Sequence, residues 1–118
     1  MLTKKTPEKI KTILKIKAQG VENTLQLTYK NHAPEKYQEF ISNPENLKVP
    51  EGTSDNAGIA MINAQIVLFV VDSFDDGTDK DFPLTLDGLV DMDQHWPGVL
   101  MGLIRGYHMA RGASVEKN

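Results

Sequence analysis

The chain has 118 residues, no Cys and a formal net charge of −3, which is long enough for one compact domain and too short for two ordinary ones. Ile, Leu, Val and Phe together number 31 of the 118 residues, above the share of roughly 20 % that is typical of disordered chains. We therefore expect a single globular domain over residues 1–118. The absence of Cys excludes disulfide frameworks, thiol catalysis and Cys-based zinc sites, and the three His residues do not follow a metal-ligand spacing.

The distribution of charge and apolar residues limits the function classes further. No apolar run is long enough to span a membrane, and the polar N-terminus does not resemble a signal peptide, which indicates a cytosolic, unprocessed protein. Residues 1–50 carry nine Lys against five Glu, whereas residues 51–118 carry four Lys or Arg against eleven Asp or Glu. Such a dipolar chain suits docking on charged protein surfaces, while its thin basic excess argues against nucleic-acid binding.

The N-terminal part is predicted to form a β-hairpin. Between residues 9 and 18 apolar and basic side chains alternate, with Ile13 out of phase, which is the period of a half-buried strand. Residues 19–23 include Gly20 and Asn23, both suited to a chain reversal. Alternation resumes over residues 24–30, where Leu25, Leu27 and Tyr29 are expected to face inward.

Helices are predicted to cover this hairpin. Pro34 begins a short helix that ends near Ser42, with Tyr37, Phe40 and Ile41 expected to face the hairpin. Residues 44–53 are predicted to form a loop. A nearly all-apolar central helix is expected over residues 56–71, N-capped by Ser54 or Thr53, although residues 66–71 could instead form a buried strand.

The C-terminal half is predicted to add an acidic loop and two more helices. The loop spans residues 72–81, and Thr85 is expected to N-cap a helix that ends near Gln94. A last helix is expected from Gly98 to Arg111, with Pro97 at its first turn, and residues 1–8 and 112–118 are expected to be flexible. The predicted fold is α+β, an N-terminal antiparallel β-hairpin packed against a bundle of three to four helices.

Two patterns invite a specific structural role. Asp72, Asp76 and Gly77 match part of a calcium-binding loop, but Phe74 and Pro83 stand where oxygen ligands are required, so a solvated turn is favoured and no metal or other cofactor is expected. In the last helix Gly98, Gly102 and Gly106 recur every four residues, followed by Ala110. This stripe predicts close packing, preferably by a neighbouring helix of the same domain and alternatively by a partner.

Candidate partner-binding residues come from basic and aromatic side chains. The lysines of the first strand form a basic face, which can bind a partner or protect an edge strand from aggregation. Trp96 and Tyr107 are more typical of a core or rim position than of a binding hot spot. No catalytic constellation or phosphate-binding loop is evident, so no enzymatic activity is expected. The candidate residues are Lys11, Lys15, Lys17, Trp96, Arg105, Tyr107 and Arg111.

Three segments in this order resemble the tail assembly chaperones of long-tailed bacteriophages. The segments read TILKIKAQGVENTLQLTYKNHAPEKYQEF, DFPLTLDGLVDM and WPGVLMGLIRGYHMARGASVEKN, and the likeness covers about residues 9–118. The positions that match the family pattern are Phe82, Pro83, Thr85, Leu89, Pro97, Tyr107 and Asn118.

The resemblance implies a non-enzymatic role in the host bacterial cytoplasm. Such a chaperone binds the helical, aggregation-prone tape measure protein, promotes polymerisation of tail tube subunits around it, and is absent from the mature virion. The expected partners are therefore the tape measure protein and the tail tube protein, and self-association is left open. The alternative is a small regulatory protein that binds nucleic acid through the lysine face of the first strand.

Overall fold

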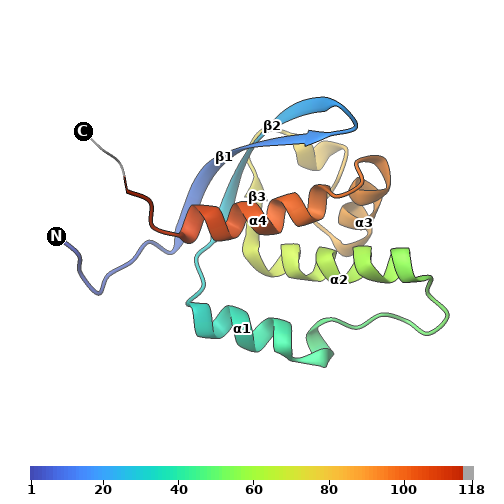
Figure 1. The fold of residues 1–118 in the computed structure, drawn as a ribbon, viewed down its shortest axis with the longest axis horizontal. Helices are drawn as coiled ribbons and strands as arrows, with labels where there is room; N and C mark the ends of the chain where they lie inside the picture. The colour runs from blue at the N-terminus through green and yellow to red at the C-terminus, as the bar shows by residue number, and fades with distance from the viewer. Residues whose placement is uncertain (116–118) are drawn as a thin grey trace.

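The computed structural model describes residues 1–115 and shows an α+β fold in which a β-hairpin packs against helices (Figure 1). The expected fold class is confirmed. The helices and strands are β1 (Lys9–Ala18), β2 (Val21–Lys30), α1 (Pro34–Ser42), α2 (Asp55–Val70), β3 (Val71–Phe74), α3 (Leu86–His95) and α4 (Val99–Arg111), with short 3-10 helices at Pro44–Asn46 (η1) and Thr78–Lys80 (η2). No helix within residues 1–115 combines the length and apolar character needed to cross a membrane.

The hairpin turn is tighter than expected. Gln19 and Gly20 both adopt positive φ angles, 53° and 78°, as a two-residue type I′ turn requires. Ala18 therefore pairs directly with Val21, and Val21 to Asn23 belong to β2 rather than to the reversal predicted over residues 19–23. The predicted alternation of faces is confirmed, because Ile13 and the lysines of β1 are exposed whereas the alternate residues are half-buried.

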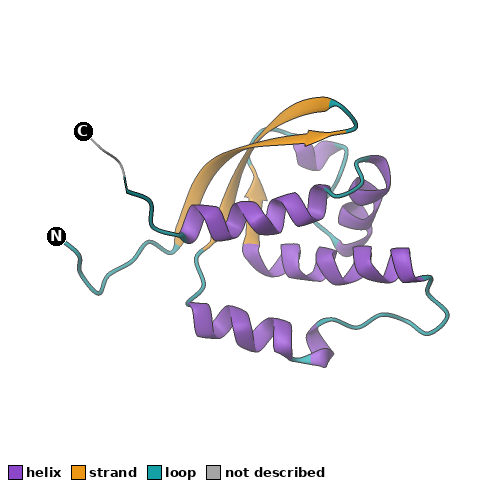
Figure 2. Cartoon of the chain, viewed as in Figure 1, coloured by secondary structure: helices purple, strands orange, loops and turns teal. Residues whose placement is uncertain are grey.

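A third strand, β3, was missed by the prediction of a loop over residues 72–81. The sheet order is β1-β2-β3, and Leu27, Thr28 and Tyr29 of β2 pair with β3 (Figure 2). Four residues with Asp72 and Ser73 at the centre give little periodic signal, so pairing with β2 decides the conformation. The central helix is confirmed up to Val70, and extended backbone begins at Val71.

Helix α4 lies against the inner face of the hairpin, and this contact explains its glycines. A Cβ atom on Gly106 would lie 2.5 Å from Leu14 Cδ1, and one on Gly102 would lie 3.3 Å from Ile16 Cδ1. The stripe thus packs on β1, not on a neighbouring helix as predicted. Gly98 does not belong to it: with φ 90° it is the N-cap of α4, so the helix begins at Val99 and Pro97 precedes the first turn.

Helix α1 packs on other helices, and the expectation that it faces the hairpin is wrong. Phe40 stacks on Phe69 of α2 with ring centroids 4.0 Å apart, and Tyr37 packs on Tyr107 and His108 of α4. Figure 1 shows α2 between α1 and the sheet. The apolar surface of α2 extends around the helix, so other elements can pack on several of its sides. Helix α1 therefore packs on α2 rather than on the hairpin.

The predicted N-caps of the central helix and of the helix after the acidic loop are confirmed by hydrogen bonds. Ser54 Oγ accepts from the Ala57 N–H at 3.4 Å, and Thr85 Oγ1 accepts from the Gly88 N–H at 3.0 Å. Helix α3 ends one residue beyond Gln94. Residues 1–8 and 112–115 form no helix or strand, and the remaining part of the predicted flexible C-terminus, residues 116–118, lies outside the described residues.

Candidate functional site

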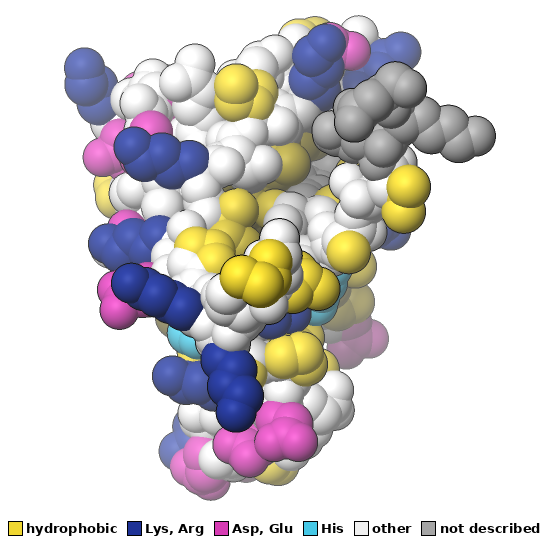
Figure 3. All heavy atoms as spheres, turned by 90° about the vertical axis from the view of Figure 1, so that its left-hand side faces the viewer, with side chains coloured by type: hydrophobic (Ala, Val, Ile, Leu, Met, Phe, Trp, Pro, Cys, Tyr) yellow, Lys and Arg dark blue, Asp and Glu magenta, His cyan; other side chains and the backbone are white. Residues whose placement is uncertain are grey.

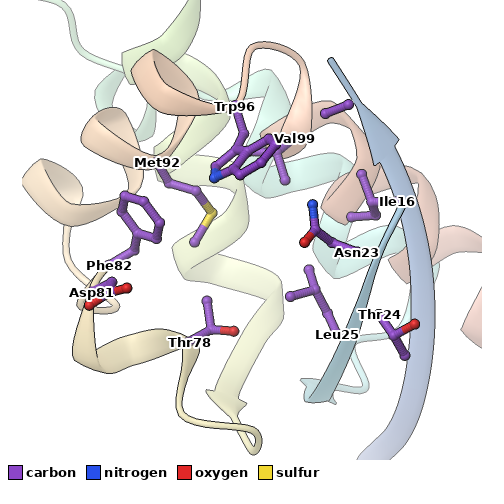
Figure 4. Close-up of a pocket in the computed structure, with 11 residues that line it drawn as sticks. Ile16, Asn23, Thr24, Leu25, Thr78, Asp81, Phe82, Met92, Trp96 and Val99 are labelled. Carbon is purple, nitrogen blue, oxygen red and sulfur yellow. The ribbon is translucent and has the colours of Figure 1, made fainter. Parts of the chain in front are cut away.

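A pocket lies between the tip of the hairpin and the α3–α4 corner (Figure 4), and we call it the hairpin-tip pocket. Its volume is about 220 Å³ and it opens to solvent. The lining residues are Ile16, Ala18, Asn23, Thr24, Leu25, Thr78, Asp81, Phe82, Met92, Trp96 and Val99. Most of them are apolar, so the pocket offers an unfilled hydrophobic surface at one end of the molecule.

The two walls of the pocket come from distant parts of the chain. Figure 4 shows Asn23 and Leu25 of β2 across the pocket from Met92 of α3 and from Trp96. The Trp96 backbone N–H donates to the Met92 carbonyl at 2.8 Å, which closes the end of α3. Trp96 is half-buried, and its indole forms part of the pocket wall. The backbone hydrogen bond to Met92 fixes the position of this residue.

The α3–α4 corner is held by a further hydrogen bond. The Gly98 N–H donates to Asp93 Oδ1 at 3.2 Å, and Gly98 has the positive φ that this corner requires. Trp96 is the C-cap of α3 and lies at this corner, next to Pro97. Its partly exposed ring at the pocket also makes Trp96 the candidate binding residue with the most favourable surroundings.

Polar groups are few in the pocket, and only one is charged. Asp81 is exposed, and no Lys, Arg or His among residues 1–115 lies within ion-pair distance of its carboxylate. Asn23, Thr24 and Thr78 add amide and hydroxyl groups to the lining. The chemistry of the pocket is therefore apolar contact with a single negative charge at its edge.

The lysine face of β1 lies on the opposite, outer side of the hairpin. Lys11, Lys15 and Lys17 are exposed there, so these three candidates are separated from Trp96. Lys9 Nζ lies 3.1 Å from Asp72 Oδ2, and Lys17 stands opposite Glu22 in the backbone register of the hairpin. Figure 3 shows basic and acidic side chains interleaved on the face it presents rather than a continuous basic area.

The acidic loop after β3 is bound to β2 rather than being a merely solvated turn. Asp75 accepts hydrogen bonds from the Thr28 hydroxyl at 2.6 Å and from the Ser73 hydroxyl at 2.7 Å. These bonds, Thr28 first, together with the charge of Lys11, hold the pKa of Asp75 below its usual value. The loop thus extends the contact between β3 and β2.

Asp76 makes a second link between this loop and β2. The Gln26 backbone N–H donates to Asp76 Oδ2 at 2.9 Å, and Thr78 donates through both its N–H and its hydroxyl to Asp76 Oδ1. Desolvation would raise the pKa of Asp76, but the hydrogen bonds outweigh it and the pKa is lowered. Within residues 1–115 no cluster of three or more His, Asp or Glu side chains is arranged to hold a metal ion.

The three candidates on α4 have different surroundings. Arg105 is exposed, whereas the Arg111 Nε–H donates to Asn31 Oδ1 at 2.8 Å. Tyr107 is only 1 % exposed, and its hydroxyl accepts from the His32 backbone N–H at 3.2 Å. Tyr107 is therefore a core residue, and its selection as a partner-binding residue is wrong because the packed fold removes it from the surface.

The rest of the pocket could not be predicted from the sequence. Asn23, Leu25, Phe82 and Met92 each fit a hairpin or helix pattern, and nothing in their spacing places β2 opposite α3. The one available signal was Trp96 next to Pro97 at a helix junction.

Comparisons of this chain with protein-family models, with curated proteins and with solved structures found no match.

Proposed function

We propose that this chain is a tail assembly chaperone of a long-tailed bacteriophage, which binds the tape measure protein and promotes tail tube polymerisation around it in the host cytoplasm. The hairpin-tip pocket is the observation that carries the proposal, because it presents an open apolar surface with a volume of about 220 Å³. The resemblance of three ordered segments to that family supplies the identity of the client.

The chemistry of the pocket suits a chaperone for an aggregation-prone helical client. Such a client exposes apolar side chains before it is enclosed by the tail tube, and burying them against an apolar surface is favourable by about 25 cal/mol per Å². The pocket lining contains no Lys, Arg or His and one carboxylate, a composition that suits contact rather than catalysis. We therefore propose a non-enzymatic role, with the protein absent from the finished virion.

The alternative, a regulator that binds nucleic acid through the lysine face, has weaker support. Binding to phosphates requires cations that are free to replace counterions. Lys9 is paired with Asp72 and Lys11 lies near Asp75, which reduces the positive potential of this face. A salt-dependent shift of duplex or single-stranded DNA by the protein would favour this alternative over the chaperone.

Co-expression with the tape measure protein of the same phage tests the proposal. The wild-type chain is expected to keep the client soluble and to co-purify with it. Ala18→Leu, which places a larger side chain in the pocket lining, is expected to reduce co-purification, whereas Ala113→Leu at an exposed position is the matched control. A client that stays insoluble and unbound beside the wild-type chain would contradict the proposal.

A further inference from the structure

We propose that the hairpin-tip pocket binds one large apolar side chain, aromatic or long aliphatic, from a basic segment of a partner protein. The inference deepens the proposed function, because it states which part of a client would occupy the same pocket. It follows from the size of the pocket, from its apolar walls and from the charge of the chain around it.

The volume of the pocket selects a side chain rather than a small-molecule ligand. Pockets for drug-sized ligands measure about 300–1,000 Å³, whereas the hairpin-tip pocket measures about 220 Å³. Leu25, Met92 and Trp96 supply apolar atoms on opposite sides of it. A single inserted side chain can contact both walls, which is the geometry of an anchor residue at a protein interface.

The charge around the pocket selects a basic partner segment. Asp81 is the one charged side chain of the pocket lining, and the stretch from Asp72 to His95, which supplies one wall, contains eight Asp against one Lys along the sequence. Lys15 and Lys17, next to the lining residues of β1, are exposed on the outer face of the hairpin. Within the described residues Asp72 forms an ion pair with Lys9, and Asp91 Oδ1 lies 3.3 Å from His95 Nδ1. Asp81 lines the pocket, and none of the basic side chains of residues 1–115 lies within ion-pair distance of it. Lys or Arg beside the inserted side chain would therefore meet an attractive potential and Asp or Glu a repulsive one.

Two polar groups can orient the inserted segment. No hydrogen bond within residues 1–115 uses the side chains of Asn23 or Trp96, and both line the pocket. The indole N–H donates only, whereas the Asn amide donates and accepts. Together they can bind backbone groups next to the inserted side chain, in the way that a few polar groups fix orientation in an apolar site.

Trp96 provides the readout for a test with defined probes, because it is the one Trp of the chain and gives a single indole N–H signal in a ¹H–¹⁵N spectrum. The probes are acetylated and amidated pentapeptides with Phe between two Lys pairs, Phe between two Glu pairs, and Ala between two Lys pairs. The basic Phe peptide is expected to shift the indole signal saturably, with half-saturation at roughly 1–10 mM, the range for a single weak anchor. The other two peptides are expected to bind at least several-fold more weakly.

Two variants test the assigned residues on the full chain. Asp81→Asn is expected to weaken binding of the basic Phe peptide about twofold to fivefold, as for an exposed ion pair. Glu51→Gln, which changes an exposed carboxylate outside the pocket lining, is the matched control. Ala18→Leu is expected to abolish saturation, with the amide spectrum confirming that the chain is folded.

The inference is overturned by any of three outcomes: no saturable indole shift, equal shifts with the Phe and Ala peptides, or equal shifts with the basic and acidic Phe peptides. None of these measurements involves the tape measure protein. Peptide binding without capture of the client would therefore contradict the proposed function alone, and capture of the client without peptide binding would contradict this inference alone.

Discussion

Replacing Gly106 by Ala is expected to destabilise the fold even though Ala favours helices. A Cβ atom at this position would lie 2.5 Å from Leu14 Cδ1 and 2.7 Å from the Tyr29 hydroxyl oxygen. Leu14 is half-buried and can adjust by a small rotation. Tyr29 is fully buried and its hydroxyl donates to the Leu103 carbonyl at 2.7 Å, so moving it means breaking a buried hydrogen bond.

The expected magnitude follows from three opposing contributions. Overpacking a core costs about 1–3 kcal/mol, and a weakened buried hydrogen bond adds about 1 kcal/mol. Ala in place of Gly within a helix returns about 0.8–1 kcal/mol. The free energy of unfolding of Gly106→Ala should therefore fall by about 1–3 kcal/mol, which for a domain of this size lowers Tm by roughly 4–12 °C.

Gly102→Ala is the matched control, since it lies on the same helix and the same stripe. The three atoms nearest to its Cβ would all belong to the Ile16 side chain: Cδ1 at 3.3 Å, at the flexible end, and Cγ2 and Cγ1 at 3.6 and 3.7 Å. The free energy of unfolding of Gly102→Ala should therefore be unchanged or higher by up to about 1 kcal/mol. Urea denaturation followed by circular dichroism measures both variants. Equal stability of the two variants would refute the contact of α4 with β1, and a double mutant with Tyr29→Phe should recover part of the Gly106→Ala loss.

Three further changes test other parts of the fold. Asp76→Ala should lower the free energy of unfolding by about 1 kcal/mol at neutral pH, because it removes the acceptor for the Gln26 N–H. Since the folded pKa of Asp76 is lowered, this difference should persist above the usual value of 3.8 and vanish as the pH falls through the folded pKa. Phe40→Ala should cost about 2 kcal/mol and speed amide exchange in α1, because the Phe69 stack is lost. Thr85→Ala should cost about 1 kcal/mol in urea denaturation through loss of the α3 cap.

Each of these variants has a conservative control. Asp79→Ala is the control for Asp76→Ala, because it removes a neighbouring carboxylate that accepts no hydrogen bond within the described residues. If the loss of unfolding free energy in Asp76→Ala did not depend on pH, the role of Asp76 as acceptor for the Gln26 N–H would be contradicted. Glu39→Ala changes an exposed residue of α1 and should leave amide exchange in α1 unchanged, unlike Phe40→Ala. Thr85→Ser keeps the capping hydroxyl, so a Ser variant as unstable as the Ala variant would exclude the capping bond.

Local chemistry explains why much of the fold could be predicted. The alternation of Lys and apolar residues in β1 sets the period of the strand, and Thr85 and Ser54 offer the oxygen atoms that helix starts require. The candidate site was predictable only at Trp96. The rest of the pocket joins β2 to α3 across more than 50 residues of sequence, a distance over which no periodic pattern carries information.

The amino-acid sequence by itself determined the strand period of the hairpin, the N-caps of α2 and α3 and the opposite charges of the two halves, because each depends on neighbours within a few residues. Only the tertiary structure decided that the α4 glycines contact β1, that Val71–Phe74 joins the sheet, that Tyr107 is buried and that a pocket forms under the hairpin tip. These features depend on which apolar surfaces pack against each other, and that is decided by the close packing of the whole chain rather than by any local segment.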